Sequence, residues 1–236
     1  MAKANATWTV LAHGPLEKLD DGLWRIEGSL PGMALKRVMT IARLADGALV
    51  IHNAIALDDA GMRALDALGK VAFIVVPNGY HRLDAPSFAK RYPDARVLAP
   101  RGARAKVEEV VTVNGDYGDL PADQHVRLEH LDGVRDGEGV MRVESDDGVT
   151  LVFNDLVFNM PHMPGFSGFV MRVLGSSGGP RVTRIARMLL IKEKAAVRAH
   201  LERLAATPRL KRIVVSHHQV IVDAPSATLA RVAATT

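Results

Sequence analysis

Apolar and polar positions along the chain form short apolar runs divided by turn residues, a pattern typical of alternating strands and helices. Residues 37–44 and 48–52 are rich in β-forming residues and are joined by Asp46-Gly47, which predicts a hairpin. Residues 71–76 (VAFIVV) are apolar at every position and are followed by a proline. We therefore expect a strand that is buried on both faces.

The remaining pattern continues the alternation. Further strands are expected at residues 24–30, 95–98, 124–131, 139–144, 149–154 and 212–216. Helices are expected at residues 58–68, 86–92, 101–110, 182–191, 194–205 and 226–232. Residues 161–168 and 175–180 are rich in Pro, Gly and Ser and are predicted to form loops. Because strands and helices are interleaved, the fold class is α/β or α+β, and a single domain is favoured because the last strand would complete a sheet.

Composition limits the compartment and the partners. The chain has 236 residues, no cysteine and 48% hydrophobic residues, which fits one globular domain and excludes disulfides and thiolate metal sites. The net charge is +4, but basic and acidic residues are mixed, so nucleic acid is not expected as a partner. No apolar run has the length of a signal peptide or a membrane span. We therefore expect a cytoplasmic protein that binds a small molecule and makes no membrane contact.

Polar side chains that can bind a metal stand where the buried strands end. They are His52, Asn78, His81, Asp155, His217 and His218. Loops at strand ends project side chains from a rigid sheet, so these residues could meet in one cleft. Imidazole and carboxylate groups together suit a divalent transition metal. A plainer interpretation also fits them, as strand-end histidines that bond to backbone groups and an aspartate that caps a turn.

The chain resembles the metallo-β-lactamase superfamily over residues 22–222. The stretches that carry the resemblance are VMTIARLADGALVIHNAIAL, IVVPNGYHRLD, RLEHLDGVRDGEGVMRV, GVTLVFNDLVFN and RIVVSHHQVI. The resemblance implies a divergent bacterial branch that has a four-layer αββα sandwich as its single domain, residues 22–236, after an N-terminal extension, residues 1–21. It also implies a metal site at the edge of the sandwich, on loops that follow strands.

The family's His-x-His-x-Asp-His motif is degenerate in the loop 78–84. If the motif starts at Asn78, its four ligand positions hold Asn, Tyr, Arg and Leu. If it starts at Gly79, the loop keeps His81 and Asp84 as ligands. The first start fits the strand end better, and neither start keeps the full set. The loss of the motif aspartate also removes the residue that would orient an attacking water.

Two other ligand positions of the family are kept. Asp155 matches the aspartate that bridges the metals, and His217 matches the histidine after the last buried strand, with His218 as its rival. A second ion would need about three more protein ligands, so the resemblance implies one divalent ion, Zn, Fe or Mn, or none. The implied ligands are His81, Asp84, Asp155 and His217. The residues expected in the pocket or around the ligands are His52, Asn78, His162 and His218.

Three classes of function are compatible with these residues. The first is a hydrolase with one metal that cleaves an ester, thioester or phosphoester. The second is an inactive pseudo-enzyme that binds a small molecule or a protein partner in the former active-site cleft. The third is nucleic-acid processing, against which the dispersed charge argues. We also expect residues 161–169, with their Met and Phe side chains, to border the cleft and make it apolar.

Overall fold

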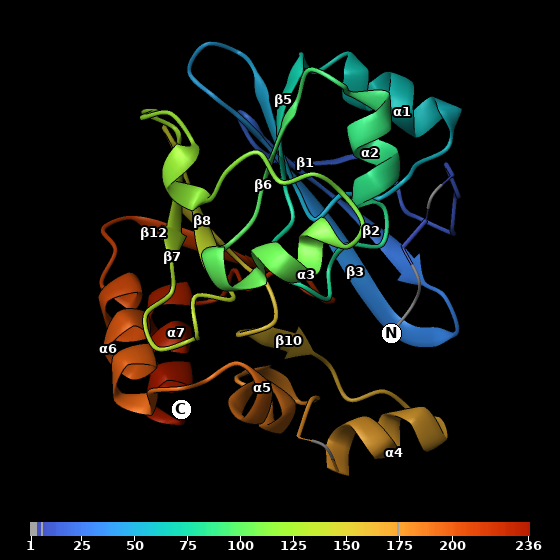
Figure 1. Ribbon diagram of the computed structural model, residues 1–236. Coiled ribbons are helices and arrows are strands. Elements are labelled where there is room, and N and C mark those ends of the chain that lie inside the picture. The colour runs from blue at the N-terminus through green and yellow to red at the C-terminus, as the bar shows by residue number, and fades with distance from the viewer. Residues whose placement is uncertain (1–3, 6, 174) are drawn as a thin grey trace.

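Two sheets lie face to face, with helices on both outer faces (Figure 1). The computed structural model describes residues 4–5, 7–173 and 175–236, apart from the side chains of Ala34 and Ser167. The first sheet has the strand order β1 (Glu17–Asp20), β2 (Leu23–Leu30), β3 (Met33–Arg43), β4 (Leu49–His52), β5 (Val71–Val75) and β6 (Arg96–Leu98). The second sheet has the order β12 (Leu210–Val215), β9 (Gly148–Phe153), β8 (Gly139–Ser145) and β7 (Val126–His130). A separate short pair consists of β10 (Phe158–Met160) and β11 (Gly179–Arg181).

Helices cover the outer face of each sheet. The first sheet is covered by α1 (Asp59–Asp66), α2 (Ala85–Arg91) and α3 (Arg104–Glu108), which follows a 3-10 turn at Arg101–Ala103. The second sheet is covered by α5 (Arg184–Leu189), α6 (Lys194–Ala205) and α7 (Pro225–Ala234). A further 3-10 turn lies at Tyr117–Asp119, and α4 (Gly165–Val173) lies at the edge of the molecule (Figure 1).

The alternation of side chains along the strands divides the core into three layers. On β4, Ile51 packs with the first group of helices, whereas its neighbour Val50 packs between the two sheets. On β9, Phe153 packs with the second group of helices, whereas Val152 packs between the sheets. The structure therefore confirms the expected four-layer αββα sandwich and the single domain.

The strand directions bring four strand ends to one edge of the sandwich. β3 and β4 form the predicted antiparallel hairpin, while β4 pairs in parallel with β5, and β9 with β12. The backbone N–H of Val38 on β3 donates to the carbonyl of Ser216, just after β12, at 2.9 Å. This bond joins the two sheets at the edge where β4, β5, β9 and β12 end.

The sequence pattern missed α4 and the pair of β10 and β11. Residues 161–168 were predicted to be a loop, but α4 begins at Gly165. Two glycines lower its helix propensity, and Phe166 and Phe169 are 81% and 61% exposed, so no core-facing pattern marked it as a helix. Residues 175–180 were also predicted to be a loop, but β11 begins at Gly179, because β10 supplies its hydrogen-bonding partner from a distant part of the chain.

The N-terminal region also contributes to the first sheet. Residues 17–20, which the sequence placed in an N-terminal extension, form the edge strand β1 and pair with β2. Trp8 stacks on Phe88 of α2, with ring centroids 5.2 Å apart. Within the described residues, no helix combines the length and apolar character needed to cross a bilayer.

The packing of the outer layer generates a matched pair of stability predictions. Phe153→Ala should lower the free energy of unfolding by about 3–5 kcal/mol, because it opens a cavity at a fully buried position. The same substitution at the exposed Phe166 should change it by less than about 0.5 kcal/mol. Urea unfolding of both variants checks this, and equal losses would contradict the layer assignment.

Candidate functional site

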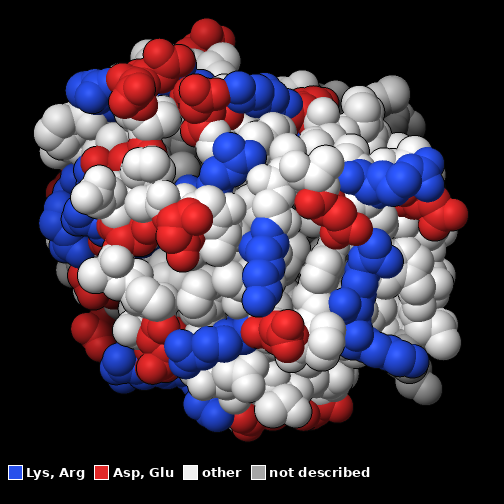
Figure 2. All heavy atoms as spheres, turned by 90° about the horizontal axis from the view of Figure 1, so that it is seen from above, with Lys and Arg blue, Asp and Glu red and all other residues white. Residues whose placement is uncertain are grey.

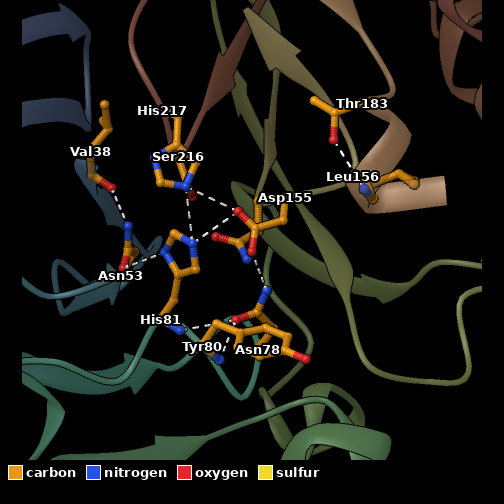
Figure 3. Close-up of polar contacts among 12 residues, drawn as sticks. Val38, Asn53, Asn78, Tyr80, His81, Asp155, Leu156, Thr183, Ser216 and His217 are labelled. Atoms are coloured by element: carbon orange, nitrogen blue, oxygen red, sulfur yellow. Dashed lines mark hydrogen bonds and ion pairs between the residues drawn. The ribbon is translucent and has the colours of Figure 1, made fainter. Parts of the chain in front are cut away.

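Polar side chains that follow four strands lie close together at the edge of the sandwich where β4, β5, β9 and β12 end (Figure 3). Asn53 follows β4, His81 lies on the loop after β5, Asp155 follows β9, and His217 follows β12. Two of these strands belong to each sheet, and the strands of each pair run in parallel. The carboxyl ends of parallel strands meet at one edge, which is the usual place for a ligand site in such a sheet.

Three metal-binding atoms form a small triangle at this point. The Nε2 atom of His81 lies 2.9 Å from Oδ1 of Asp155, and Nε2 of His217 lies 3.0 Å from the same oxygen. The two Nε2 atoms are 3.2 Å apart. Among the described residues, these three form the one group of at least three potential ligands whose binding atoms all lie within 4.8 Å of one another.

Hydrogen bonds on the far side of each imidazole determine which nitrogen carries the proton. Asn53 donates its amide to the Val38 carbonyl at 2.8 Å, so its Oδ1 faces Nδ1 of His81 at 3.1 Å and accepts a proton from it. Nδ1 of His217 lies 2.6 Å from the carbonyl of Lys36, which can only accept. Both neutral rings therefore carry their proton on Nδ1, and both Nε2 lone pairs face Asp155.

The resulting donor set fits a metal ion. Three atoms that each offer a lone pair lie about 3 Å apart, and such a group requires a proton or a cation among its members. Ligands of a tetrahedral zinc ion, at about 2.0–2.2 Å from the metal, are separated by roughly 3.3 Å. Small adjustments of these side chains would therefore accommodate an ion with one carboxylate and two imidazole ligands.

Asn78 aligns both the aspartate and the loop that carries His81. Its Nδ2 donates to Oδ2 of Asp155 and to Oε1 of Glu138, each at 2.7 Å. Its Oδ1 accepts the backbone N–H groups of Tyr80 at 2.8 Å and His81 at 3.0 Å. The Asp155 carboxylate is thus held by Asn78 through one oxygen, which leaves the other oxygen facing the imidazoles (Figure 3).

Glu138 is a fully buried carboxyl group behind the site, and the sequence analysis did not single it out. It accepts hydrogen bonds from the side chain of Asn154 and from the backbone N–H groups of Asp155 and Leu156 as well as from Asn78. Burial, followed by the charge of Asp155, raises the pKa of Glu138 to about 8, although the two asparagine amides oppose this shift. Its role is to hold the chain at the end of β9 in place.

Electrostatics keep Asp155 ionised. Burial alone would raise the pKa of Asp155, but the adjacent His81 and His217 lower it well below its ordinary value, because when protonated they attract the carboxylate and donate hydrogen bonds to it. The phenyl ring of Phe158 stacks on His217, with ring centroids 4.8 Å apart, and covers one face of that imidazole. The carboxylate is therefore in the deprotonated form that binds a cation.

A cavity of about 770 Å³ opens onto the triangle. Its polar lining consists of Arg37, Asn53, Tyr80, Ser176 and Thr183 besides the three ligands, and the rest of its wall is apolar. The apolar wall is formed by Leu30, Pro31, Met33, Leu35, Leu83, Phe158, Met171, Ile185, Ala186, Leu189 and Leu190. The cavity is as apolar as expected, but the described residues of 161–169 do not line it; Phe158 and Met171 on either side of that stretch do.

The structure places Asp84 outside the triangle. Its carboxylate forms a buried ion pair with Arg37 at 2.6 Å and accepts hydrogen bonds from the backbone N–H of Ala56 at 3.0 Å and the side chain of Asn5 at 2.7 Å. The expected ligand set of four therefore reduces to His81, Asp155 and His217. The reason is that Asp84 occupies the N-terminus of α2, where Arg37 from β3 neutralises it.

His52, His162 and His218 were also expected in or around the pocket, but none of them belongs to the triangle or lines the cavity. His52 on β4 is buried opposite Thr40 and Val75, and neither of its ring nitrogens has a hydrogen-bond partner among the described residues. His218 is buried and pairs through its backbone with Asn159. His162 is exposed and lies 3.1 Å from the hydroxyl of Ser177.

Comparison with known proteins identifies the fold. No family model matches the chain, and no curated protein matches it. A metallo-β-lactamase from Erythrobacter litoralis, with β-mercaptoethanol in the active site, is 13% identical with a TM-score of 0.60 over 94% of this chain and 96% of that chain. The DIM-1 metallo-β-lactamase exposed to ceftazidime is 10% identical with a TM-score of 0.63 over 96% of this chain and 98% of that chain. The chain therefore has the metallo-β-lactamase fold over nearly its whole length.

The ion pair of Asp84 separates a structural role from a metal-binding role. Asp84→Asn should lower the free energy of unfolding by about 3–5 kcal/mol, because it leaves the charge of Arg37 buried without its partner. Asp147→Asn, which weakens an exposed pair with Lys211, should cost less than about 1 kcal/mol. Urea unfolding measures both, and a folded Asp84→Asn protein that loses bound metal would show Asp84 to be a ligand.

The buried ring of His52 generates a prediction about acid stability. Burial, and then the charge on His81, lower the pKa of His52 from 6.5 to about 3, so the folded protein holds the ring neutral. Below pH 6.5 the ring becomes protonated in the unfolded chain but stays neutral in the folded protein. The free energy of unfolding therefore falls as the pH falls toward 3. His52→Leu should remove about 2 kcal/mol of the stability loss between pH 7 and pH 5. Unfolding curves with a chelator present measure this, and parallel pH profiles for the two proteins would contradict it.

Proposed function

Because the chain has the metallo-β-lactamase fold, we propose that it is a hydrolase that uses one divalent metal ion held by His81, Asp155 and His217. The observation that carries this proposal is the triangle of three lone-pair donors, 2.9–3.2 Å apart, at the floor of a cavity. A site with three protein ligands keeps a fourth position for water or substrate, as catalytic zinc sites do. The mainly apolar wall favours an ester or thioester with an apolar acyl group.

The chemistry divides between the ion and the residues around it. A bound divalent ion supplies Lewis acidity, which polarises a carbonyl and lowers the pKa of a water molecule. The chain's own part is orientation: Asn53 and the Lys36 carbonyl hold the two imidazoles, and Asn78 holds the carboxylate. The apolar wall excludes bulk water and positions the acyl chain, which strengthens electrostatic interactions at the floor of the cavity.

A second candidate function is a pseudo-enzyme that binds an apolar small molecule in the same cavity without turnover. The observation that favours it is the incomplete ligand loop after β5. In its better-fitting register, three of the family's ligand positions hold Asn78, Tyr80 and Arg82, and Asn78 is a hydrogen-bond donor to Asp155 rather than a ligand. This alternative differs from the first proposal in needing no metal.

Metal content tests the first proposal directly. Protein purified without chelator should contain about one equivalent of Zn, Fe or Mn. Asp155→Ala and His217→Ala should each weaken metal binding by more than 100-fold, because loss of a ligand exceeds the roughly 10–100-fold cost of losing a supporting residue. His200→Ala removes a histidine on α6 that bonds to Asp132 outside the site, and it should keep the metal. Elemental analysis of the four proteins measures this.

Turnover then separates the two candidate functions. The metal-loaded protein should hydrolyse p-nitrophenyl esters or acyl thioesters, with a preference for longer acyl chains, and His217→Ala should be inactive. A wild-type protein that binds no metal, and whose Asp155→Ala and His217→Ala variants differ only slightly in stability, would support the pseudo-enzyme. Full metal content in both variants would place the site elsewhere.

A further inference from the structure

Large hydrophobic side chains are exposed together on three segments beside the cavity. These segments are the start of β3, helix α4 and helix α5. The exposed side chains are Met33 on the first, Phe166, Phe169 and Val173 on the second, and Ile185, Met188 and Leu189 on the third. Phe166 is 81% exposed and Met188 is 73% exposed, so these side chains are not partly hidden core residues. We call these seven side chains the rim surface.

Part of the rim surface also lines the cavity. Met33, Ile185 and Leu189 are exposed and also line the cavity, and Met171 of α4 lines it as well. Helices α4 and α5 lie near each other at one end of the molecule (Figure 1), and Arg184 of α5 donates a hydrogen bond to the carbonyl of Val173 in α4 at 3.3 Å. The apolar wall of the cavity therefore reaches the molecular surface at Met33, Ile185 and Leu189. Large apolar side chains exposed together in this way mark an interaction site.

The same region carries positive charge without acidic residues. No aspartate or glutamate occurs between Leu156 and Lys192. The basic residues of this stretch are Arg172, Arg181, Arg184, Arg187 and Lys192. Among the described residues, none of the four arginines forms an ion pair, and three of them donate to backbone carbonyls instead. The opposite end of the molecule differs, because acidic and basic side chains are interspersed there (Figure 2).

We propose that the rim surface docks peripherally on a lipid bilayer that contains anionic headgroups. Exposed Phe, Met and Leu side chains enter the boundary between headgroups and acyl chains, and the arginines contact the anionic headgroups. Arginine side chains suit this role because their apolar stems lie along the interface while the guanidinium reaches the headgroup. The sequence suggested no membrane contact because it contains no spanning segment; a peripheral contact needs none.

Charge favours the bilayer over a second copy of the chain. In a symmetric dimer the same surface would face itself, so the arginines of both copies would lie close together. Like charges across an interface oppose association, whereas an anionic bilayer complements both the charge and the apolar side chains. Docking would also place the cavity mouth at a source of acyl chains, a consequence that rests on the proposed hydrolase function.

Vesicle binding tests the proposal without any turnover. In co-sedimentation, the wild-type protein should bind mixed phosphatidylcholine–phosphatidylglycerol vesicles more tightly than pure phosphatidylcholine vesicles, and salt should weaken the difference. Phe166→Ser with Phe169→Ser should lower the affinity for mixed vesicles by about tenfold or more. Arg172→Gln with Arg184→Gln should lower it by roughly tenfold for mixed vesicles but little for pure phosphatidylcholine.

Matched variants control for charge, apolar surface and folding. Lys90→Gln with Arg127→Gln removes the same charge elsewhere, and Val10→Ser with Val222→Ser removes exposed apolar residues elsewhere. Both pairs should bind vesicles like the wild type, and thermal melting should show that all variants are folded. His217→Ala should also bind vesicles normally, so a failed hydrolase proposal leaves this result intact.

Three outcomes would overturn docking on a bilayer. One is no binding to mixed vesicles, and another is binding that the rim variants and the control variants reduce equally. The third combines two results: the protein does not bind vesicles, and light scattering shows a wild-type dimer that becomes a monomer when Phe166→Ser and Phe169→Ser are combined. That outcome would assign the rim surface to contact with a second copy of the chain.

Discussion

Strand β3 holds both histidines of the candidate metal centre, although they come from different sheets. The Lys36 carbonyl accepts a hydrogen bond from His217. The Val38 carbonyl accepts one from the Asn53 amide, and the oxygen of that amide accepts one from His81. Carbonyls two residues apart on a strand point to the same side, so one register of β3 sets both imidazoles. A shift of β3 by one residue would withdraw both acceptors together, and the triangle of metal-binding atoms depends on that register.

The carboxylate of the triangle depends on a second support, from the other sheet. Glu138 lies just before β8 and takes hydrogen bonds from the chain that follows β9. Backbone N–H groups at a buried strand end would each cost about 1–3 kcal/mol without a partner. Glu138 satisfies two of them, and Asn78 connects the same carboxyl group to Asp155. The hydrogen bonds that stabilise the chain after β9 are therefore the same ones that orient the Asp155 carboxylate.

Local pattern predicted the mixed class of strands and helices and the strand-end residues of the site, and the family resemblance implied the four-layer sandwich. Buried strands are visible as apolar runs, and polar residues directly after them identified His81, Asp155 and His217 as neighbours in one cleft. The sequence could not predict which polar residues would pair with one another. Asp84 was expected as a ligand because of its place in a motif, but its partner Arg37 lies on a distant strand.

Two supporting residues of the site were missed for the same reason. Asn53 stands next to His52, which was expected in the pocket, and a left-handed backbone conformation with φ 60° turns the chain at this position. Asparagine tolerates that conformation better than most residues, which was the one local signal available. Glu138 gives no local signal, because an acidic residue in a Gly-rich turn is ordinarily exposed. Its hydrogen bonds come from two distant segments, the loop after β5 and the chain after β9.

The proton positions on the two imidazoles also determine which end of a guest molecule the cavity accepts first. Two neutral rings and one carboxylate contribute a single negative charge, so a divalent ion among them would leave one positive charge uncompensated. A charge in a poorly solvated place interacts strongly with a nearby anion or polar oxygen. An amphiphile would therefore enter with its polar end toward the floor and its hydrocarbon tail along the wall toward Met33 and Leu189. If the rim surface docks on a bilayer, the tail would then be the last part of the molecule to leave the bilayer and the first part to return to it.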